Sequence, residues 1–173
     1  MIEKTALMKH AAALIARRAH SRGELRRKLA AAHKTEEAKE IEAVLDRLNH
    51  LNILNDAEFA YNFAFYHIKN SGWGEDKIRA ALLGKDVAKA DADRALERVR
   101  EEIAPDGAND ALMEYVNSYC RKHGSPSTLK DAQKLARHLA GRGFDEDGVI
   151  GALRQITTKE IFQHFEGTGD CAT

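Results

Sequence analysis

The stretch "LARHLAGRGFDEDGVIGAL", residues 135–153, contains two short amphipathic helices joined at a Gly-Phe corner. An earlier stretch, "IRAALLGKDVAKADADRAL" at residues 78–96, has the same apolar spacing when Ile78 is aligned with Leu135. The alignment pairs Leu82 with Leu139, Val87 with Phe144 and Leu96 with Leu153, and it leaves the glycines before the corner, Gly84 and Gly143, offset by two positions. A looser third copy lies at residues 25–45. A chain that repeats one helical unit is built as an array.

The composition of the chain favours helix over sheet. Its 173 residues include 28 alanines and only five valines, and alanine favours helices whereas valine favours strands. Pro105 and Pro126 fall between the apolar-periodic segments, where helices end in any case. The sequence therefore predicts an all-α protein.

Three repeats of three helices account for most of the chain. The predicted repeats are residues 1–55, 56–104 and 108–156, and residues 157–173 are predicted to form a helix fragment and a polar tail. A unit of about fifty residues buries little surface alone. We therefore expect the repeats to stack on one another into an elongated, curved array.

Local signals predict where the helices of each repeat begin. Ser21 opens a capping box in which its side chain binds the Glu24 amide and the Glu24 side chain reaches back to the Ser21 amide. Asp145 is predicted to cap the last helix of the third repeat. The equivalent leucines of the three second helices, Leu29, Leu82 and Leu139, are predicted to be buried. The opening helix of the second repeat is predicted to place Phe59, Phe63 and Tyr66 on one face.

Positive charge is concentrated near the start of the chain, although the net charge is zero. Residues 1–34 carry nine Lys/Arg against two Asp/Glu, and residues 35–60 carry two against seven. The cluster consists of Arg17, Arg18, Arg22, Arg26, Arg27 and Lys28. A solvated surface neutralised by Glu36, Glu37 and Glu40 would produce this pattern, and so would a binding surface for acidic protein or phosphate.

Two arginines extend the basic cluster into the later repeats. Arg79 occupies the repeat position of Arg26, and Arg137 occupies that of Arg27. Arginine can pair with carboxylate or phosphate in a bidentate manner. The predicted partner-binding residues are therefore Arg17, Arg18, Arg22, Arg26, Arg27, Lys28, Arg79 and Arg137.

No pattern typical of an enzyme, a metal site or a cofactor site is found, so we expect none of these. The histidines form no i, i+4 pair, and there is no C-x-x-C. Asp145–Asp147 are expected to complement a helix N-terminus rather than bind a metal. Trp73 is expected to be an aromatic plug, with a stacking platform for a base as the alternative. No apolar run reaches the length of a membrane span, and Cys120 and Cys171 are unpatterned. These features predict a cytoplasmic protein, and we expect a monomer.

Four blocks of the chain, in order, resemble the bacterial RecX family. They are "HSRGELRRKL" (20–29), "LNDAEFA" (54–60), "GWGEDKIRAAL" (72–82) and "RHLAGRGFDEDGVIGAL" (137–153). The family usually has a glycine where this sequence has Asn52, and Asn also tolerates a left-handed turn. The overall charge is more neutral than in many relatives.

The resemblance implies a non-enzymatic protein built of three modified helix-turn-helix repeats. It implies binding to RecA, chiefly as the RecA–DNA filament, and inhibition of its ATPase, strand-exchange and co-protease activities, hence a role in recombination, DNA repair and the SOS response. Weak direct contact with DNA is a further expectation. Two alternatives stay open: a helix-turn-helix DNA-binding protein that acts without RecA, and a structural adaptor unrelated to recombination.

Overall fold

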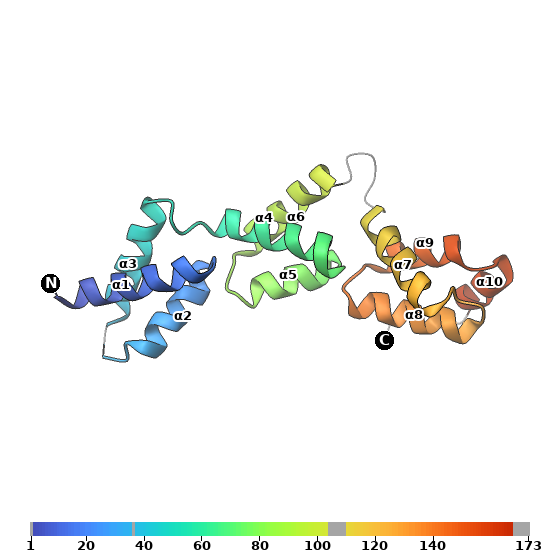
Figure 1. Cartoon of the computed structure of the whole chain (residues 1–173), viewed down its shortest axis with the longest axis horizontal. Coiled ribbons are helices and arrows are strands. Elements are labelled where there is room, and N and C mark those ends of the chain that lie inside the picture. The colour runs from blue at the N-terminus through green and yellow to red at the C-terminus, as the bar shows by residue number, and fades with distance from the viewer. Residues whose placement is uncertain (1, 36, 104–109, 168–173) are drawn as a thin grey trace. The chain divides into compact units, whose positions relative to one another are not determined.

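The computed structural model describes residues 2–35, 37–103 and 110–167, and within these ranges every regular element is a helix (Figure 1). A π-helical segment, His67–Ser71, separates α4 from α5. The α-helices are α1 (Ile2–Arg17), α2 (Arg22–Ala32), α3 (Ala38–His50), α4 (Asp56–Tyr66), α5 (Glu75–Leu83), α6 (Lys89–Ile103), α7 (Asp110–His123), α8 (Leu129–Gly141), α9 (Glu146–Ile156) and α10 (Lys159–Gly167). The prediction of an all-α fold is confirmed. Glu36, Pro105 and Cys171 lie outside the described residues.

The chain divides into two compact units. The N-terminal unit comprises Met1–Phe63 and Ala81–Ala95, and the C-terminal unit comprises Ala64–Ala80 and Leu96–Thr173. Each of the helices α4, α5 and α6 crosses from one unit to the other, so the middle group of helices contributes to both. The predicted repeat boundaries and the stacking of the repeats stay predictions.

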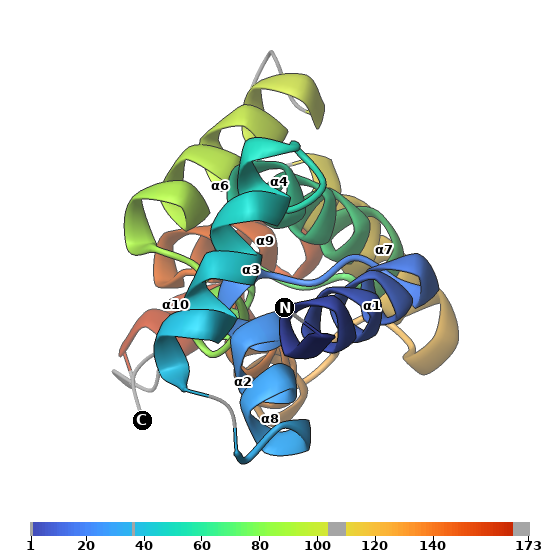
Figure 2. The same ribbon diagram turned by 90° about the vertical axis from the view of Figure 1, so that its left-hand side faces the viewer.

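The core of the N-terminal unit lies among α1, α2 and α3, each of which contacts the other two (Figure 2). Leu7 and Leu25 are fully buried there beside Leu45. Burial of each such side chain stabilises the fold by roughly 1.5–3 kcal/mol. The apolar faces predicted for these helices therefore hold the unit together.

The core of the C-terminal unit contains one helix more than the three-helix pattern predicts. Helices α7, α8 and α9 supply Leu112, Leu135 and Leu153, and α10 adds Phe162 and Phe165 to the same cluster. Helix α10 contacts α8 and α9. The segment from residue 157 was predicted as a helix fragment and a polar tail, and its helix closes the apolar core.

The burial of the second helices follows the repeat alignment. Leu29, Leu82 and Leu139 are each fully buried, which confirms that prediction. On α4 the rings of Phe59 and Phe63 stack with centroids 6.1 Å apart, as their predicted common face allows. The residues that α4 buries fully are Ala60 and Ala64, whereas Tyr66 is 57% exposed. The small alanines face inward because a helix packs closely where its side chains are short.

Left-handed backbone occurs at two turns that the repeat alignment relates to each other. Asp86 has φ 58° and Gly143 has φ 85°, and the offset that aligns Leu82 with Leu139 also aligns these two residues. Gly84 therefore corresponds to Gly141, and the turn needs φ > 0 two residues later. The two-residue offset between Gly84 and Gly143 is thereby explained. Asn52 has φ 52°, as expected of an Asn that replaces a glycine.

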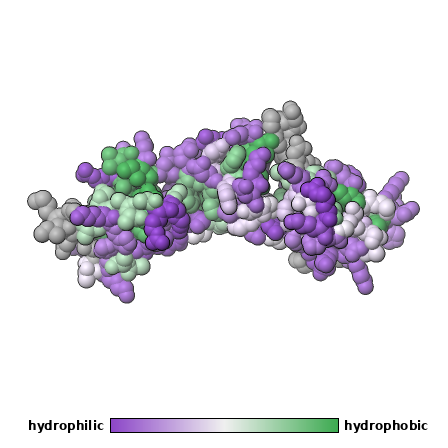
Figure 3. Space-filling view, in the orientation of Figure 1, coloured by the Kyte–Doolittle hydropathy of each residue, from purple (hydrophilic) through white to green (hydrophobic). Residues whose placement is uncertain are grey.

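None of the described helices is long and apolar enough to cross a membrane. Leu51 and Ile53, in the turn after α3, are 57% and 52% exposed. Figure 3 shows apolar surface at this end of α3.

Candidate partner-binding surface

Helix α2 carries most of the predicted basic cluster, and its N-terminal cap fixes which way that cluster faces. The Ser21 hydroxyl accepts a hydrogen bond from the Glu24 amide at 3.1 Å, as predicted. The Glu24 carboxylate contacts Arg18 and Lys85 rather than the Ser21 amide, so the second half of the predicted capping box is wrong. With Leu25 and Leu29 in the core, the arginines of α2 face outward.

Two arginines of α2 pair with carboxylates of α3. The Arg22 guanidinium lies 2.6 Å from Glu42 and 2.7 Å from Asp46, and Arg26 also pairs with Glu42. Hydrogen bonds from Arg26, and then from Arg22, lower the pKa of the Glu42 carboxyl. Much of the positive charge on this face is therefore offset within the protein.

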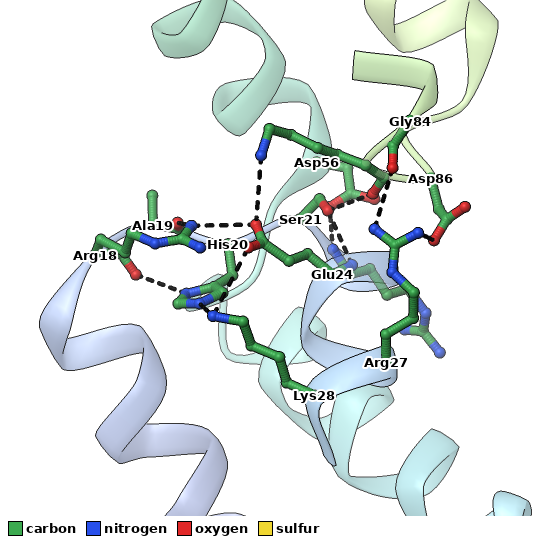
Figure 4. A network of polar contacts seen from close by, with 12 residues as sticks. Arg18, Ala19, His20, Ser21, Glu24, Arg27, Lys28, Asp56, Gly84 and Asp86 are labelled. Atoms are coloured by element: carbon green, nitrogen blue, oxygen red, sulfur yellow. Dashed lines mark hydrogen bonds and ion pairs between the residues drawn. The ribbon is translucent and has the colours of Figure 1, made fainter. Parts of the chain in front are cut away.

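A second network joins α2 to the turn between α5 and α6, and Figure 4 shows it. The Ser21 hydroxyl donates to the Lys85 carbonyl at 2.6 Å. Arg27 donates to the Gly84 carbonyl at 3.1 Å and pairs with Asp86 at 3.0 Å. We call this contact, between residues 21–27 and 84–86, the first joint.

Glu24 is the most strongly perturbed carboxylate of this network. Its side chain is only 12% exposed and lies within 4 Å of Arg18, Lys28 and Lys85. The hydrogen bond from Arg18, aided by Lys85, lowers the pKa of Glu24 to about 2. The carboxylate therefore stays ionised and holds these three cations in place.

We call Arg17, Arg18, Arg22, Arg26, Arg27 and Lys28 the α2 cluster, although the first two residues precede the helix. Different acids from those expected neutralise it. Glu36 lies outside the described residues, and Glu37 pairs with Lys39. The acids that pair with the cluster are Glu24, Glu42, Asp46 and Asp86. Arg17 is exposed, and among the described residues no carboxylate forms an ion pair with it.

The remaining predicted arginines lie in the C-terminal unit. Arg79, on α5, pairs with Asp76 at 2.7 Å. Arg137, on α8, is exposed, and its Nε donates to the Gln133 carbonyl at 3.4 Å. Whether they share a face with the α2 cluster stays a prediction.

A second joint, between residues 74–77 and 141–143, lies within the C-terminal unit. The Gly74 amide donates to the Arg142 carbonyl at 2.8 Å, and the Asp76 amide donates to the Gly143 carbonyl at 3.2 Å. The repeat alignment places Gly74 at the position of Ser21 and Arg142 at that of Lys85. The same joint therefore occurs twice, closed largely by side chains in the N-terminal unit and by backbone in the C-terminal unit.

Trp73 packs beside the second joint. Its ring stacks on His67 with centroids 4.0 Å apart, and the Lys77 ammonium lies 5.0 Å from its centroid. These contacts favour the aromatic plug over the stacking platform, because neighbouring side chains already engage the ring.

Helix α8 carries three exposed cations on one face, of which the sequence analysis identified only Arg137. Lys130, Lys134 and Arg137 are spaced at i, i+4 and i+7, so they form a row on the helix. We call them the α8 row. Within residues 110–167 none of them is in an ion pair. Their helical spacing is the sequence signal from which this row could have been predicted.

No cofactor or metal site emerges from the described side chains. Among them, no group of three His, Cys, Asp or Glu residues could hold a metal ion. Asp145 caps α9 through the Gly148 amide at 2.9 Å, which confirms its predicted role.

Comparison of the sequence with known proteins gives matches to one family. A family model described as RecX, second three-helix domain, matches residues 55–96. The regulatory protein RecX of Ectopseudomonas mendocina is 32% identical over 142 residues, which cover 81% of this chain and 87% of that protein. The regulatory protein RecX of a Thermus thermophilus strain is 33% identical over 145 residues, covering 84% and 88%. That of a Pseudomonas putida strain is 40% identical over 150 residues, covering 86% and 88%.

Solved structures show the same fold at lower sequence identity. The crystal structure of RecX from Lactobacillus salivarius superposes with a TM-score of 0.73 at 16% identity, covering 96% of this chain and 99% of that one. A second structure, of a regulatory protein RecX, gives a TM-score of 0.71 at 16% identity, with 88% and 71% covered. At this identity the likeness concerns the fold alone.

Proposed function

The chain belongs to the RecX family of regulatory proteins, and from that premise we propose that it binds RecA, chiefly as the RecA–DNA filament, and restrains its ATPase, strand-exchange and co-protease activities. The observation that carries the proposal is the match to regulatory RecX proteins over more than four fifths of the chain. In this role the protein regulates recombination, DNA repair and the SOS response. It works without catalysis and without a cofactor, as a monomer in the cytoplasm.

The basic residues are the proposed contacts with the partner, and their ion pairs determine how much each can contribute. An arginine that already pairs with a carboxylate retains free N–H donors, but its charge is offset and attracts a distant anion weakly. Arg17 and Arg137 are exposed without an ion pair among the described residues, so they contribute most. Arg18, Arg22, Arg26, Arg27, Lys28 and Arg79 contribute through the donors that remain.

The DNA-dependent ATPase of the cognate RecA, measured with and without this protein, tests the proposal. We expect the rate of ATP hydrolysis to fall as the protein is added, and the fall to persist when free DNA is in excess. An unchanged rate at saturating protein would contradict it. If excess DNA restores the full rate, the protein acts by sequestering DNA, which is the helix-turn-helix alternative.

A further inference from the structure

His20, in the segment between α1 and α2, is a polar side chain in the interior of the N-terminal unit. It is 5% exposed, and among the described residues only Ser21 is a buried polar side chain besides it. Its Nδ1 atom lies 2.8 Å from the Arg18 carbonyl oxygen, and its Nε2 atom lies 3.0 Å from the Lys28 ammonium (Figure 4). Burying a polar ring is costly unless its nitrogens are hydrogen-bonded, so these two contacts account for its position.

The two partners determine the protonation state of the His20 ring. A carbonyl oxygen only accepts hydrogen bonds, so Nδ1 carries a hydrogen and donates it to Arg18. An ammonium group only donates, so Nε2 carries no hydrogen and accepts from Lys28. The ring is therefore neutral in this arrangement. Burial, the largest influence, lowers the pKa of His20, and the charges of Arg18 and Lys28 act in the same direction, against the Arg18 carbonyl and Glu24.

Lys28 is held at its ammonium group from two sides. Its Nζ atom lies 3.0 Å from His20 and 3.8 Å from the Glu24 carboxylate. That carboxylate also pairs with Arg18 and with Lys85, a cation from the turn between α5 and α6, so it is shared among three cations. The lone pair of His20 makes the closer contact with Lys28 and thereby fixes the position of a charge whose side chain is 40% exposed.

We propose that His20 is a positioning residue of the partner-binding surface: its neutral ring holds the Lys28 ammonium in place for a carboxylate of the partner. The inference rests on the proposed function, because Lys28 belongs to the α2 cluster. A lysine side chain is flexible, and ordering it on binding lowers the affinity, so a lysine that is already held binds more tightly. Protonation puts a hydrogen on Nε2, and the ring can then no longer accept from Lys28.

A double-mutant cycle on the inhibition of RecA tests whether His20 acts through Lys28. The variant Lys28→Gln should raise the concentration of protein that halves the ATPase rate by about three- to fivefold, as expected of one exposed cation. His20→Leu, which fills the buried position but removes the acceptor, should raise it by about two- to threefold. It should cause no further rise when Lys28→Gln is already present. An equal rise in both backgrounds would overturn the proposal.

Two further variants test whether the effect belongs to the acceptor on the ring. His20→Gln retains an acceptor in its amide oxygen and should inhibit RecA as well as the unaltered protein does. His10→Leu is the matched control, because the His10 ring, also partly buried, lies 2.9 Å from His33 and is paired with that ring instead of a lysine. Its half-inhibitory concentration should be unchanged, and circular dichroism should show that all the variants are helical. Inhibition by His20→Gln as weak as that by His20→Leu would overturn the proposal.

NMR of the protein alone tests the positioning without RecA. The nitrogen chemical shifts of His20 should show hydrogen on Nδ1 near neutral pH, and the Lys28 side-chain signals should shift as His20 is protonated, with a midpoint below about pH 6.5. Hydrogen on Nε2 instead, or Lys28 signals that His20→Leu leaves unchanged, would overturn the proposal. If the NMR result holds but the unaltered protein leaves the ATPase rate unchanged, the proposed function fails while the contact of His20 with Lys28 stands.

Discussion

The α2 cluster and the α8 row both lie in basic stretches of the sequence, and they differ in the folded protein. Residues 17–28 and residues 117–142 each contain six Lys/Arg and one acidic residue. On α2 the cations pair with Glu42 and Asp46 of α3, and with Asp86 across the first joint. On α8, among the described residues, Lys130, Lys134 and Arg137 form no ion pair.

The density of basic residues along a chain therefore does not measure the charge that a partner meets. Three of the acids that offset the α2 cluster, Glu42, Asp46 and Asp86, lie some 15 to 60 positions away in sequence. Helix α8 carries Ala132 and Ala136, both buried, where α2 carries Arg22 and Arg26, and α10 packs against this helix. Its cations lie on the opposite face, where no described carboxylate forms an ion pair with them.

The largest expected effect concerns the buried leucines that α2 and α8 have at equivalent positions. Leu29 and Leu139 are equivalent and fully buried, so replacing either by alanine should destabilise the protein by roughly 2–5 kcal/mol. Urea unfolding of Leu29→Ala and Leu139→Ala measures both costs. A cost below about 1 kcal/mol for either one would mean that the inner faces of the two helices are not equivalent.

A smaller effect on stability is expected at the first joint, where α2 contacts the turn between α5 and α6. A methyl group at Gly23 would overlap the Asp86 side chain, so Gly23→Ala should cost about 1–3 kcal/mol in spite of the better helix propensity of alanine. Gly141, the last residue of α8, has open space around it, and Gly141→Ala is the matched control. Thermal unfolding should show a lowered Tm for the first variant only. Equal Tm values for the two variants would indicate that the first joint can accommodate the extra methyl group with little loss of stability.

Removing one charge should destabilise the protein more in the α2 cluster than in the α8 row. Glu24→Gln removes the charge that holds Arg18 and Lys85, and we expect a loss of about 1–2 kcal/mol. Lys134→Gln, at the equivalent position of α8, should change stability by less than about 0.5 kcal/mol. Chemical denaturation of both variants checks this, and a larger cost at Lys134 would show that the α8 row has partners in the fold.

The smallest effect is the pH dependence of stability that Glu24 contributes in the first joint. The pKa of Glu24 is lowered from 4.5 to about 2, so the unfolded chain takes up this proton first as the pH falls. The stabilisation is complete above about pH 4.5 and is lost towards pH 2. Asp56 has the opposite effect on stability as the pH falls, because burial raises the pKa of its carboxyl group. The stability difference between the unaltered protein and Glu24→Gln should therefore shrink over this range, and a constant difference would contradict the role of Glu24.

Local sequence determined the helices and their inward faces. Alanine-rich segments with apolar residues at helical spacing form helices wherever they pack, and Ser21, Thr128 and Asp145 cap the helices that follow them. The burial of the repeated leucines also followed from spacing alone. These properties depend on residues within one or two helical turns of each other, so one sequence is enough to predict them.

Tertiary structure decided which charges remain available and how the repeats join. Neither the pairing of Arg22 with Asp46 nor that of Arg27 with Asp86 could be deduced from spacing, because each joins residues that only the fold brings together. The inward face of α4 and the contribution of α10 to the core depended in the same way on the neighbours each helix meets. An ion pair needs its two groups within about 4 Å, and periodicity along one helix does not report the distance to another.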